Sequence, residues 1–176
     1  MANTNTTTTA RPEILCTQPV IESATTTLLK TPFGAMHDLF QVLDACQHYV
    51  DALIENDDNT ERMALCGRLL AALEVLKVAL KTPLPAHLIE RLTVDVAEPD
   101  NYRGPLSTDS ETLREYCSAL TIVLLQRQQS PEQEEQITGL LFELINLLVE
   151  DLKTPRFVRT DGGLAMISGE AVPGIH

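Results

Sequence analysis

The chain contains no tryptophan, and aromatic residues make up only 4% of its 176 residues. Hydrophobic residues still account for 44% of the sequence, so a core must be built mainly from leucine, isoleucine, valine and alanine. That composition favours packed helices over an aromatic-rich β-sandwich. The length suits a single domain.

Positive charge is scarce as well, because 13 Lys and Arg residues stand against 25 Asp and Glu residues, for a formal net charge of −12. Phosphate backbones and anionic membrane surfaces are bound through clustered Lys and Arg. The densest apolar run, 139–149, contains Glu143 and Asn146 and is shorter than the about 20 residues that a bilayer requires. We therefore expect no direct contact with nucleic acid and none with a membrane, and a protein as the partner.

The four cysteines form no metal or disulfide motif. No Cys-x-x-Cys is present, and no histidine stands at a zinc-site spacing from a cysteine. Reduced thiols are therefore predicted. The first residues lack the basic start and the apolar segment of a secretory signal, so we expect a cytoplasmic protein.

No arrangement of residues predicts a catalytic centre, since nucleophile-elbow and Cys/His motifs are missing. The strongest cluster is His37, Asp44 and His48 on the polar face of an expected helix. The two imidazoles are eleven residues apart, which corresponds to about 16 Å along a helix and is too far for one ion. A metal protein that uses Asp44 with His48 is a third hypothesis, and the preferred interpretation is a solvated helix face without catalytic, metal or cofactor-binding residues.

Hydrophobic periodicity predicts four amphipathic helices. The first starts with Thr31 as N-cap and Pro32 at the first helical position and ends near Glu55. The second covers 60–81. The third starts with a capping box of Thr108 and Glu111 and buries a face that includes Tyr116, and the fourth covers 131–153 with Leu140 facing inward.

Three further segments surround these helices. The Thr-rich segment 1–30 is expected to be disordered, because its composition cannot offset the entropy lost on ordering. The connector 83–106 is punctuated by prolines and contains a possible short helix at 86–93. The tail 156–176 is expected to be irregular or to form a short β-hairpin around Asp161-Gly162-Gly163.

The tripeptide Lys-Thr-Pro occurs at 30–32, 81–83 and 153–155, each time directly after a leucine. When the second copy is aligned with the third, the two preceding helices agree at a separation of 72 residues, and the helices before them agree at 71. Leucine-rich helices can also be slid into agreement by chance, so an internal duplication is a hypothesis. The most informative aligned pairs are Gly67 with Gly139, Leu69 with Leu141, and Cys46 with Cys117.

The hairpin pattern resembles short bacterial helical-hairpin families of unknown function. The residues that carry the resemblance are "LDACQHYVDALIENDD" with "LLAALEVLKVALK", and "LREYCSALTIVLLQ" with "LLFELINLLVEDLK". The resemblance implies helical hairpins and supplies no activity.

Together these patterns predict an all-α protein, a four-helix up-down bundle from two related hairpins at 31–82 and 107–154 within a domain at 31–155. Such a topology brings the two hairpin turns to one end, where their carboxylates would form an acidic pole.

The preferred function is a non-enzymatic, cytoplasmic interaction or regulatory protein that binds a protein partner or forms a homodimer. The alternative is an acidic decoy or DNA mimic from a bacterial mobile element. Candidate partner-binding residues are Leu70, Val75, Val78, Phe142 and Leu147 on the helices, and Asp57, Asp58, Glu61, Glu132, Glu134 and Glu135 at the acidic pole.

Overall fold

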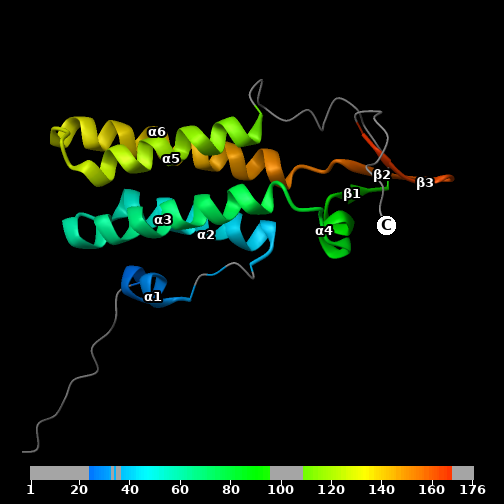
Figure 1. Cartoon of the computed structure of the whole chain (residues 1–176), viewed down its shortest axis with the longest axis horizontal. Coiled ribbons are helices and arrows are strands. Elements are labelled where there is room, and N and C mark those ends of the chain that lie inside the picture. Colours follow the sequence, from blue (N-terminus) through cyan, green and yellow to red (C-terminus); the bar gives the residue numbers. More distant parts are fainter. Residues whose placement is uncertain (1–23, 33, 35–36, 96–108, 168–176) are drawn as a thin grey trace, which may run out of the picture.

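The computed structural model describes residues 24–32, 34, 37–95 and 109–167. Helices make up most of this part of the chain, as expected, and a small three-stranded sheet accompanies them (Figure 1). The elements are α1 (Ala24–Lys30), α2 (Leu39–Glu55), α3 (Asn59–Ala79), α4 (Ala86–Arg91), β1 (Thr93–Val94), α5 (Ser110–Gln126), α6 (Pro131–Lys153), β2 (Phe157–Thr160) and β3 (Gly163–Met166).

The four long helices enclose one core. α2 packs against α3 and α6, and α5 packs against the same two helices, while α1 lies on α3. Of the large side chains that are fully buried, all but Ile145 are leucines, which agrees with the composition of the sequence. The turn between α2 and α3 and the turn between α5 and α6 lie at one end of the four helices, and α4 and the strands lie at the other (Figure 1).

The start of the first long helix differs from the prediction. α2 is capped by Asp38, whose side chain accepts a hydrogen bond from Gln41 N at 2.9 Å, while the Gln41 side chain accepts one from Asp38 N. Thr31 instead ends α1, because its N–H and its Oγ1 both donate to the Thr27 carbonyl. The prediction of a Thr31 cap is therefore wrong, and residues 24–30, assigned to a disordered tail, form a helix. Residues 1–23 of that tail lie outside the described residues.

The third long helix starts close to the prediction, with its N-cap one residue later than predicted. Asp109, not Thr108, is the N-cap of α5 and accepts a hydrogen bond from Thr112 N at 2.9 Å. Thr108 lies outside the described residues. Tyr116 was expected in the core but is 54% exposed. The helix is rotated so that three polar side chains are buried instead, namely Arg114, Ser118 and Thr121.

α6 has the predicted bounds, with Ser130 and Gln133 forming a capping box and Pro131 in the first turn. Its buried face is only partly as predicted. Leu140 is 50% exposed, whereas Thr138 and Val149 are buried. This rotation brings Thr138 beneath the turn between α2 and α3.

Of the two alternatives for the C-terminal tail, irregular or a short β-hairpin, the structure has the hairpin, with β2 antiparallel to β3 and Thr160 paired with Gly163. Residues 168–176 of the tail lie outside the described residues. Gly163 has a φ of +113°, a conformation that favours glycine. The short helix predicted in the connector is confirmed as α4. β1 was not predicted, and it follows α4 and pairs with β2 in parallel, Thr93 opposite Phe157.

In the part of the chain that the structure covers, no helix is both long enough and apolar enough to cross a membrane.

Candidate functional site

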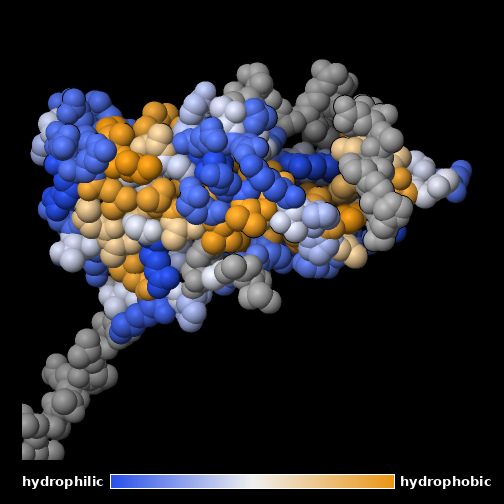
Figure 2. Space-filling model, in the orientation of Figure 1, coloured by the Kyte–Doolittle hydropathy of each residue, from blue (hydrophilic) through white to orange (hydrophobic). Residues whose placement is uncertain are grey.

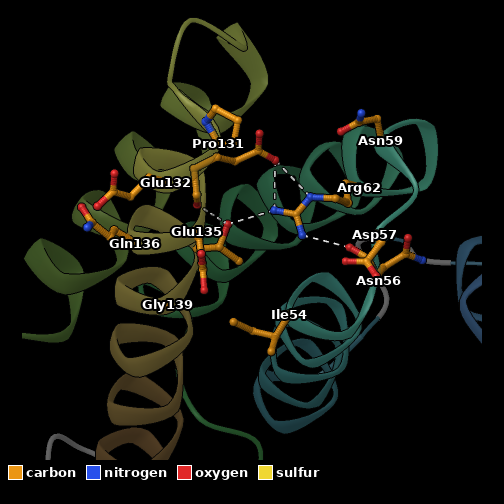
Figure 3. A pocket seen from close by; sticks show the side chains of 12 residues that line it. Ile54, Asn56, Asp57, Asn59, Arg62, Pro131, Glu132, Glu135, Gln136 and Gly139 are labelled. Carbon is orange, nitrogen blue, oxygen red and sulfur yellow. Dashed lines mark hydrogen bonds and ion pairs between the residues drawn. The ribbon is translucent and has the colours of Figure 1, made fainter.

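Carboxylates from both hairpin turns gather at one end of the helices, as the sequence predicted. Asp57 of the first turn and Glu132, Glu134 and Glu135 at the start of α6 line a common depression of about 800 Å³. Figure 3 shows this depression with Arg62 between the two groups. We call the six carboxylates Asp57, Asp58, Glu61, Glu132, Glu134 and Glu135 the acidic pole.

Three members of the acidic pole have structural partners. Asp58 caps α3 by accepting hydrogen bonds from the N–H groups of Thr60 and Glu61, at 2.8 and 2.9 Å. Glu61 accepts a hydrogen bond from Asn56 Nδ2 at 2.6 Å, and Glu134 pairs with Arg62. These contacts explain the positions of Asp58, Glu61 and Glu134 without a binding partner.

The other three carboxylates of the pole have no such role. Within the described part of the chain, Asp57, Glu132 and Glu135 are exposed and have no hydrogen bond or ion pair to their side chains. Glu134 is the one carboxylate of the pole with an ion pair in the described residues, so the pole keeps most of its negative charge, and these three side chains also lack hydrogen-bond donors.

Arg62 ties the two turns together. Its guanidinium donates to the carbonyl oxygens of Leu53 and Asn56 at 2.6 and 3.0 Å, closing the end of α2. It also donates to Thr138 Oγ1 at 3.1 Å and to Glu134 Oε1 at 3.0 Å on α6. Its donors are occupied by the protein itself, so Arg62 is a structural clamp rather than an anion-binding group.

A second hollow lies at the opposite end of α3 and has a volume of about 600 Å³. We call it the α3 groove. Mostly apolar side chains form it, and Val78 at its side is 66% exposed. Figure 2 shows hydrophobic surface over this end of α3. The groove is lined by His37, Asp38, Leu39, Glu74, Val75, Val78, Ala79, Thr82, Pro83, Leu84 and Pro85.

The five apolar residues that the sequence proposed for partner binding do not form one surface. Val75 and Phe142 are half-buried and pack on the core from different helices. Val75 and Val78 meet in the α3 groove. Leu70 and Leu147 are half-buried on α3 and α6, two helices that do not pack side by side. Val75 and Val78 are therefore the two of these five residues that line the α3 groove.

Other exposed apolar side chains are scattered over the helices. Figure 2 shows hydrophobic patches interrupted by polar side chains on the visible face. The apolar pattern within each helix predicts Tyr116 and Leu140 in the core, whereas both are surface residues, because the neighbouring helices decide which face is buried. Besides Val78, the large hydrophobic side chains exposed in the described ranges are Ile54, Tyr116, Ile122 and Leu140.

The histidines of α2 and its approach line a smaller hollow next to α1. His37, Asp44 and His48 border a space of about 300 Å³. Asp44 Oδ1 pairs with Lys153 Nζ at 2.5 Å, and His37 Nδ1 lies 2.8 Å from the Gly34 carbonyl oxygen. Among the residues that the structure covers, no group of three or more His, Cys, Asp or Glu side chains is arranged to hold a metal ion.

The interior contains three thiols and one arginine. Burial raises the pKa of Cys46 and Cys117 to about 12 and that of Cys66 to about 11. Arg114 is 2% exposed, and its Nε is the one buried side-chain nitrogen in the described residues without a hydrogen-bond partner. Its Nη1 lies 3.3 Å from Ser118 Oγ and 3.7 Å from Glu74 Oε1, which places it behind the rim of the α3 groove.

Comparisons of the chain with protein-family models, with curated proteins and with solved structures found no match.

Proposed function

We propose that the chain is a non-enzymatic protein-interaction or regulatory module that binds a protein partner, or a second copy of itself, through its helices. The observation that carries the proposal is the α3 groove, in which the aliphatic side chain of Val78 is left 66% exposed beside a hollow of about 600 Å³. Covering such a side chain contributes on the order of 1 kcal/mol to binding, and neighbouring apolar side chains add to it. Exposed apolar hollows of this kind are typical of interaction sites.

The state of the cysteines supports a binding role in the cytoplasm. Cys46, Cys66 and Cys117 are free and buried, and their raised pKa values keep them as protonated thiols, which are poor nucleophiles. Free thiols are the usual state in a reducing compartment.

Position-specific photo-crosslinking in the native host tests this function. A photoreactive residue at position 78 is expected to form crosslinks to a protein, and excess unmodified chain should compete them away. Glu150 is the matched control position, because it is exposed and lies 72 residues after Val78, at the aligned position of α6. Equal crosslinking from position 150, or none from position 78, would contradict the proposal.

The acidic pole favours a second candidate, a decoy that occupies a nucleic-acid-binding protein. Asp57, Glu132 and Glu135 present three carboxylates without structural partners in the described residues, and the whole chain carries a net charge of −12. A basic surface that binds DNA phosphates could dock on such an array, with a binding constant that falls as salt is added.

Retention of DNA-binding proteins on the immobilised chain tests this candidate. The triple variant D57N/E132Q/E135Q should weaken retention and its salt dependence, whereas E143Q/E150Q/D161N, which removes the same charge elsewhere, should not. Retention that is insensitive to salt, or that both variants weaken equally, would count against the decoy.

We also infer that α2, α3, α5 and α6 form an up-down four-helix bundle from two related hairpins. The helix caps support this, because Asp38 and Asp109 are 71 residues apart and Asp58 and Ser130 are 72 apart. α2 and α5 both have 17 residues. The first turn has three residues, 56–58, and the second has four, 127–130, which accounts for the change of one residue in the separation.

The contacts between the hairpins agree with the same interpretation. If α2 corresponds to α5 and α3 to α6, the packing of α2 on α6 and that of α5 on α3 are equivalent, and both are present. A hairpin that cannot bury its apolar face alone does so against its copy. The α3 groove breaks this equivalence, since Glu150 of α6 stands where α3 has Val78.

A further inference from the structure

The floor of the α3 groove is apolar and held in place by the core. Val75, Ala79 and Leu84 line the groove and pack against buried core residues. Leu39, at the start of α2, is itself 7% exposed. Because these side chains are fixed from behind, the hollow is not simply filled by a small movement of its walls.

The rim carries two carboxylates, and no Lys or Arg is among the described residues that line the groove. Burial tends to raise the pKa of Asp38, but the hydrogen bond from Gln41 N and the contact with the His87 ring outweigh it and hold the pKa below its usual 3.8. Asp38 is therefore ionised at neutral pH. His87 Nε2 lies 3.1 Å from Asp38 Oδ2 and is 60% exposed, so this contact is open to solvent.

Glu74, the second rim carboxylate, is 58% exposed. Its closest cation in the described part is Arg114, whose Nη1 lies 3.7 Å from Glu74 Oε1, longer than a hydrogen bond. Glu74 therefore forms an ion pair with Arg114 but accepts no hydrogen bond in the described residues, so its acceptor sites are open to another donor. The groove combines an apolar floor with two carboxylates at its edge.

A second copy of the chain fits this surface poorly. The chain has a net charge of −12, so two copies repel one another, and like charges brought together across an interface lower its affinity. A surface with an apolar centre and a negative rim is complementary to a segment with apolar side chains flanked by Lys or Arg.

We propose that the α3 groove binds a basic amphipathic segment of a partner protein, with an apolar side chain on Val75 and Val78 and a Lys or Arg at Asp38 and Glu74. This inference rests on the proposed interaction function and adds the chemistry of the partner. The basic amphipathic helix is a common form of such a segment.

Titration of the full chain with three short fluorescein-labelled peptides tests the chemistry. The first is an amphipathic Leu/Lys helix, the second has Glu in place of Lys, and the third has Ser in place of Leu. Fluorescence anisotropy should show saturable binding of the Leu/Lys peptide, and binding at least about tenfold weaker for the other two. Its affinity should fall as salt is raised from about 50 to about 300 mM.

Variants locate the binding on the chain. V78S should weaken binding of the Leu/Lys peptide about fivefold or more, whereas L140S, at a leucine that is 50% exposed on α6, should leave it unchanged. D38N and E74Q should each weaken it about two- to fivefold and reduce its salt dependence, and E143Q should not. Asn is as good an N-cap as Asp, so D38N keeps the start of α2.

Several results would overturn the inference. They are equal binding of the Leu/Lys and Leu/Glu peptides, no saturable binding of the Leu/Lys peptide, or no effect of V78S. A mass that rises with concentration and returns to that of a monomer in V78S would identify a second copy as the occupant, and a crosslink from position 78 to the same chain would identify one of its own segments.

The two proposals fail separately. If position 78 crosslinks to another protein while the peptide results are negative, the interaction function stands and the basic segment is wrong. If the peptides bind as expected while position 78 gives no crosslink in the host, the groove has the stated chemistry but the interaction function fails.

Discussion

Arg62 of α3 and Glu134 of α6 form an ion pair in which both Nε and Nη2 of the arginine lie 3.0 Å from Oε1 of the glutamate. The arginine also closes the end of α2 through the Leu53 and Asn56 carbonyls. One side chain therefore joins three helices at the end where the acidic pole lies. This clamp holds the turn between α2 and α3 against the start of α6, the two segments that carry the carboxylates of the pole.

Replacing the clamp should destabilise the fold. R62A leaves two carbonyls and Thr138 without their donor, and we expect a loss of about 2–4 kcal/mol in the free energy of unfolding, measured with urea. E134Q keeps an acceptor and should cost about 1 kcal/mol or less. R159A, at an arginine that is 54% exposed, is the control and should cost under about 0.5 kcal/mol. An R62A variant as stable as R159A would show that the clamp contributes little.

Aligned leucines of the two hairpins should matter equally. Leu69 and Leu141 are 72 residues apart, and both have 0% exposure. L69A and L141A should each cost about 2–5 kcal/mol in urea unfolding, because each leaves a cavity. L140A, one residue before the buried Leu141 and at a side chain that is 50% exposed, should change stability by less than about 0.5 kcal/mol. A large loss in the free energy of unfolding for L140A would indicate that Leu140 faces the core, as the sequence predicted.

The four long helices were predictable from the sequence, but α1 and the start of α2 were not. Thr31-Pro32 and Asp38 with Gln41 are both good local start signals. The choice is made by contacts far away in the sequence. Arg68 of α3 donates to the carbonyl oxygens of Leu29 and Thr31, which fixes the end of α1 at this point.

The rotation of α5 shows the same limit. The apolar pattern of the helix predicts a buried Tyr116, but Tyr116 is 54% exposed and Arg114 is buried. α5 packs on both α3 and α6, so the direction of its buried face depends on two partners that a helical wheel does not contain.

The two candidate sites differ in whether the sequence alone could predict them. The acidic pole could be predicted because topology alone brings the two turns together. The α3 groove could not, because it needs Asp38, Val78 and Leu84 from three separate segments. Only the excess of apolar residues on α3, Val75 and Val78 included, signalled it.

The cap of α2 should contribute to the pH dependence of stability. The pKa of Asp38 is lowered in the folded chain, so its contribution is fully present above the usual value of 3.8 and is lost as the pH falls through the lowered value. Urea unfolding of wild type and D38N should therefore differ most at neutral pH and converge toward about pH 2. D38A should lose about 1 kcal/mol at neutral pH, because the cap itself is gone. A constant difference between wild type and D38N at all pH values would contradict the ionised cap.

The buried thiols should be unreactive in the folded protein. With pKa values of about 12 for Cys46 and Cys117 and about 11 for Cys66, iodoacetamide at about pH 8 should leave their peptides unmodified, as read by mass spectrometry. In guanidinium chloride the same peptides should be alkylated fully. Because these pKa values are raised, their contribution to stability is present below the usual value of 9.0 and declines as the pH rises above it. Rapid alkylation of any of the three in the folded chain would show that the core opens there.

Arg114 should be replaceable at a gain in stability. It is 2% exposed, its Nε has no partner among the described residues, and its aligned position in the first hairpin, 71 residues earlier, is the fully buried Leu43. A buried, incompletely paired charge costs more than an apolar side chain of similar volume. R114L should therefore raise the free energy of unfolding by about 1–3 kcal/mol, and R114A should be less stable than R114L because it leaves a cavity.

The R114L variant should also change peptide binding, which can be measured separately from stability. Removing the cation behind Glu74 should strengthen binding of the Leu/Lys peptide about two- to threefold, because the rim of the α3 groove becomes more negative. R114L that is less stable than wild type would mean that the bonds of Arg114 to Ser118 and Glu115 outweigh the cost of burying it. R114L that is more stable but binds the peptide no better would leave the stability argument intact and show that Glu74 does not act at the rim.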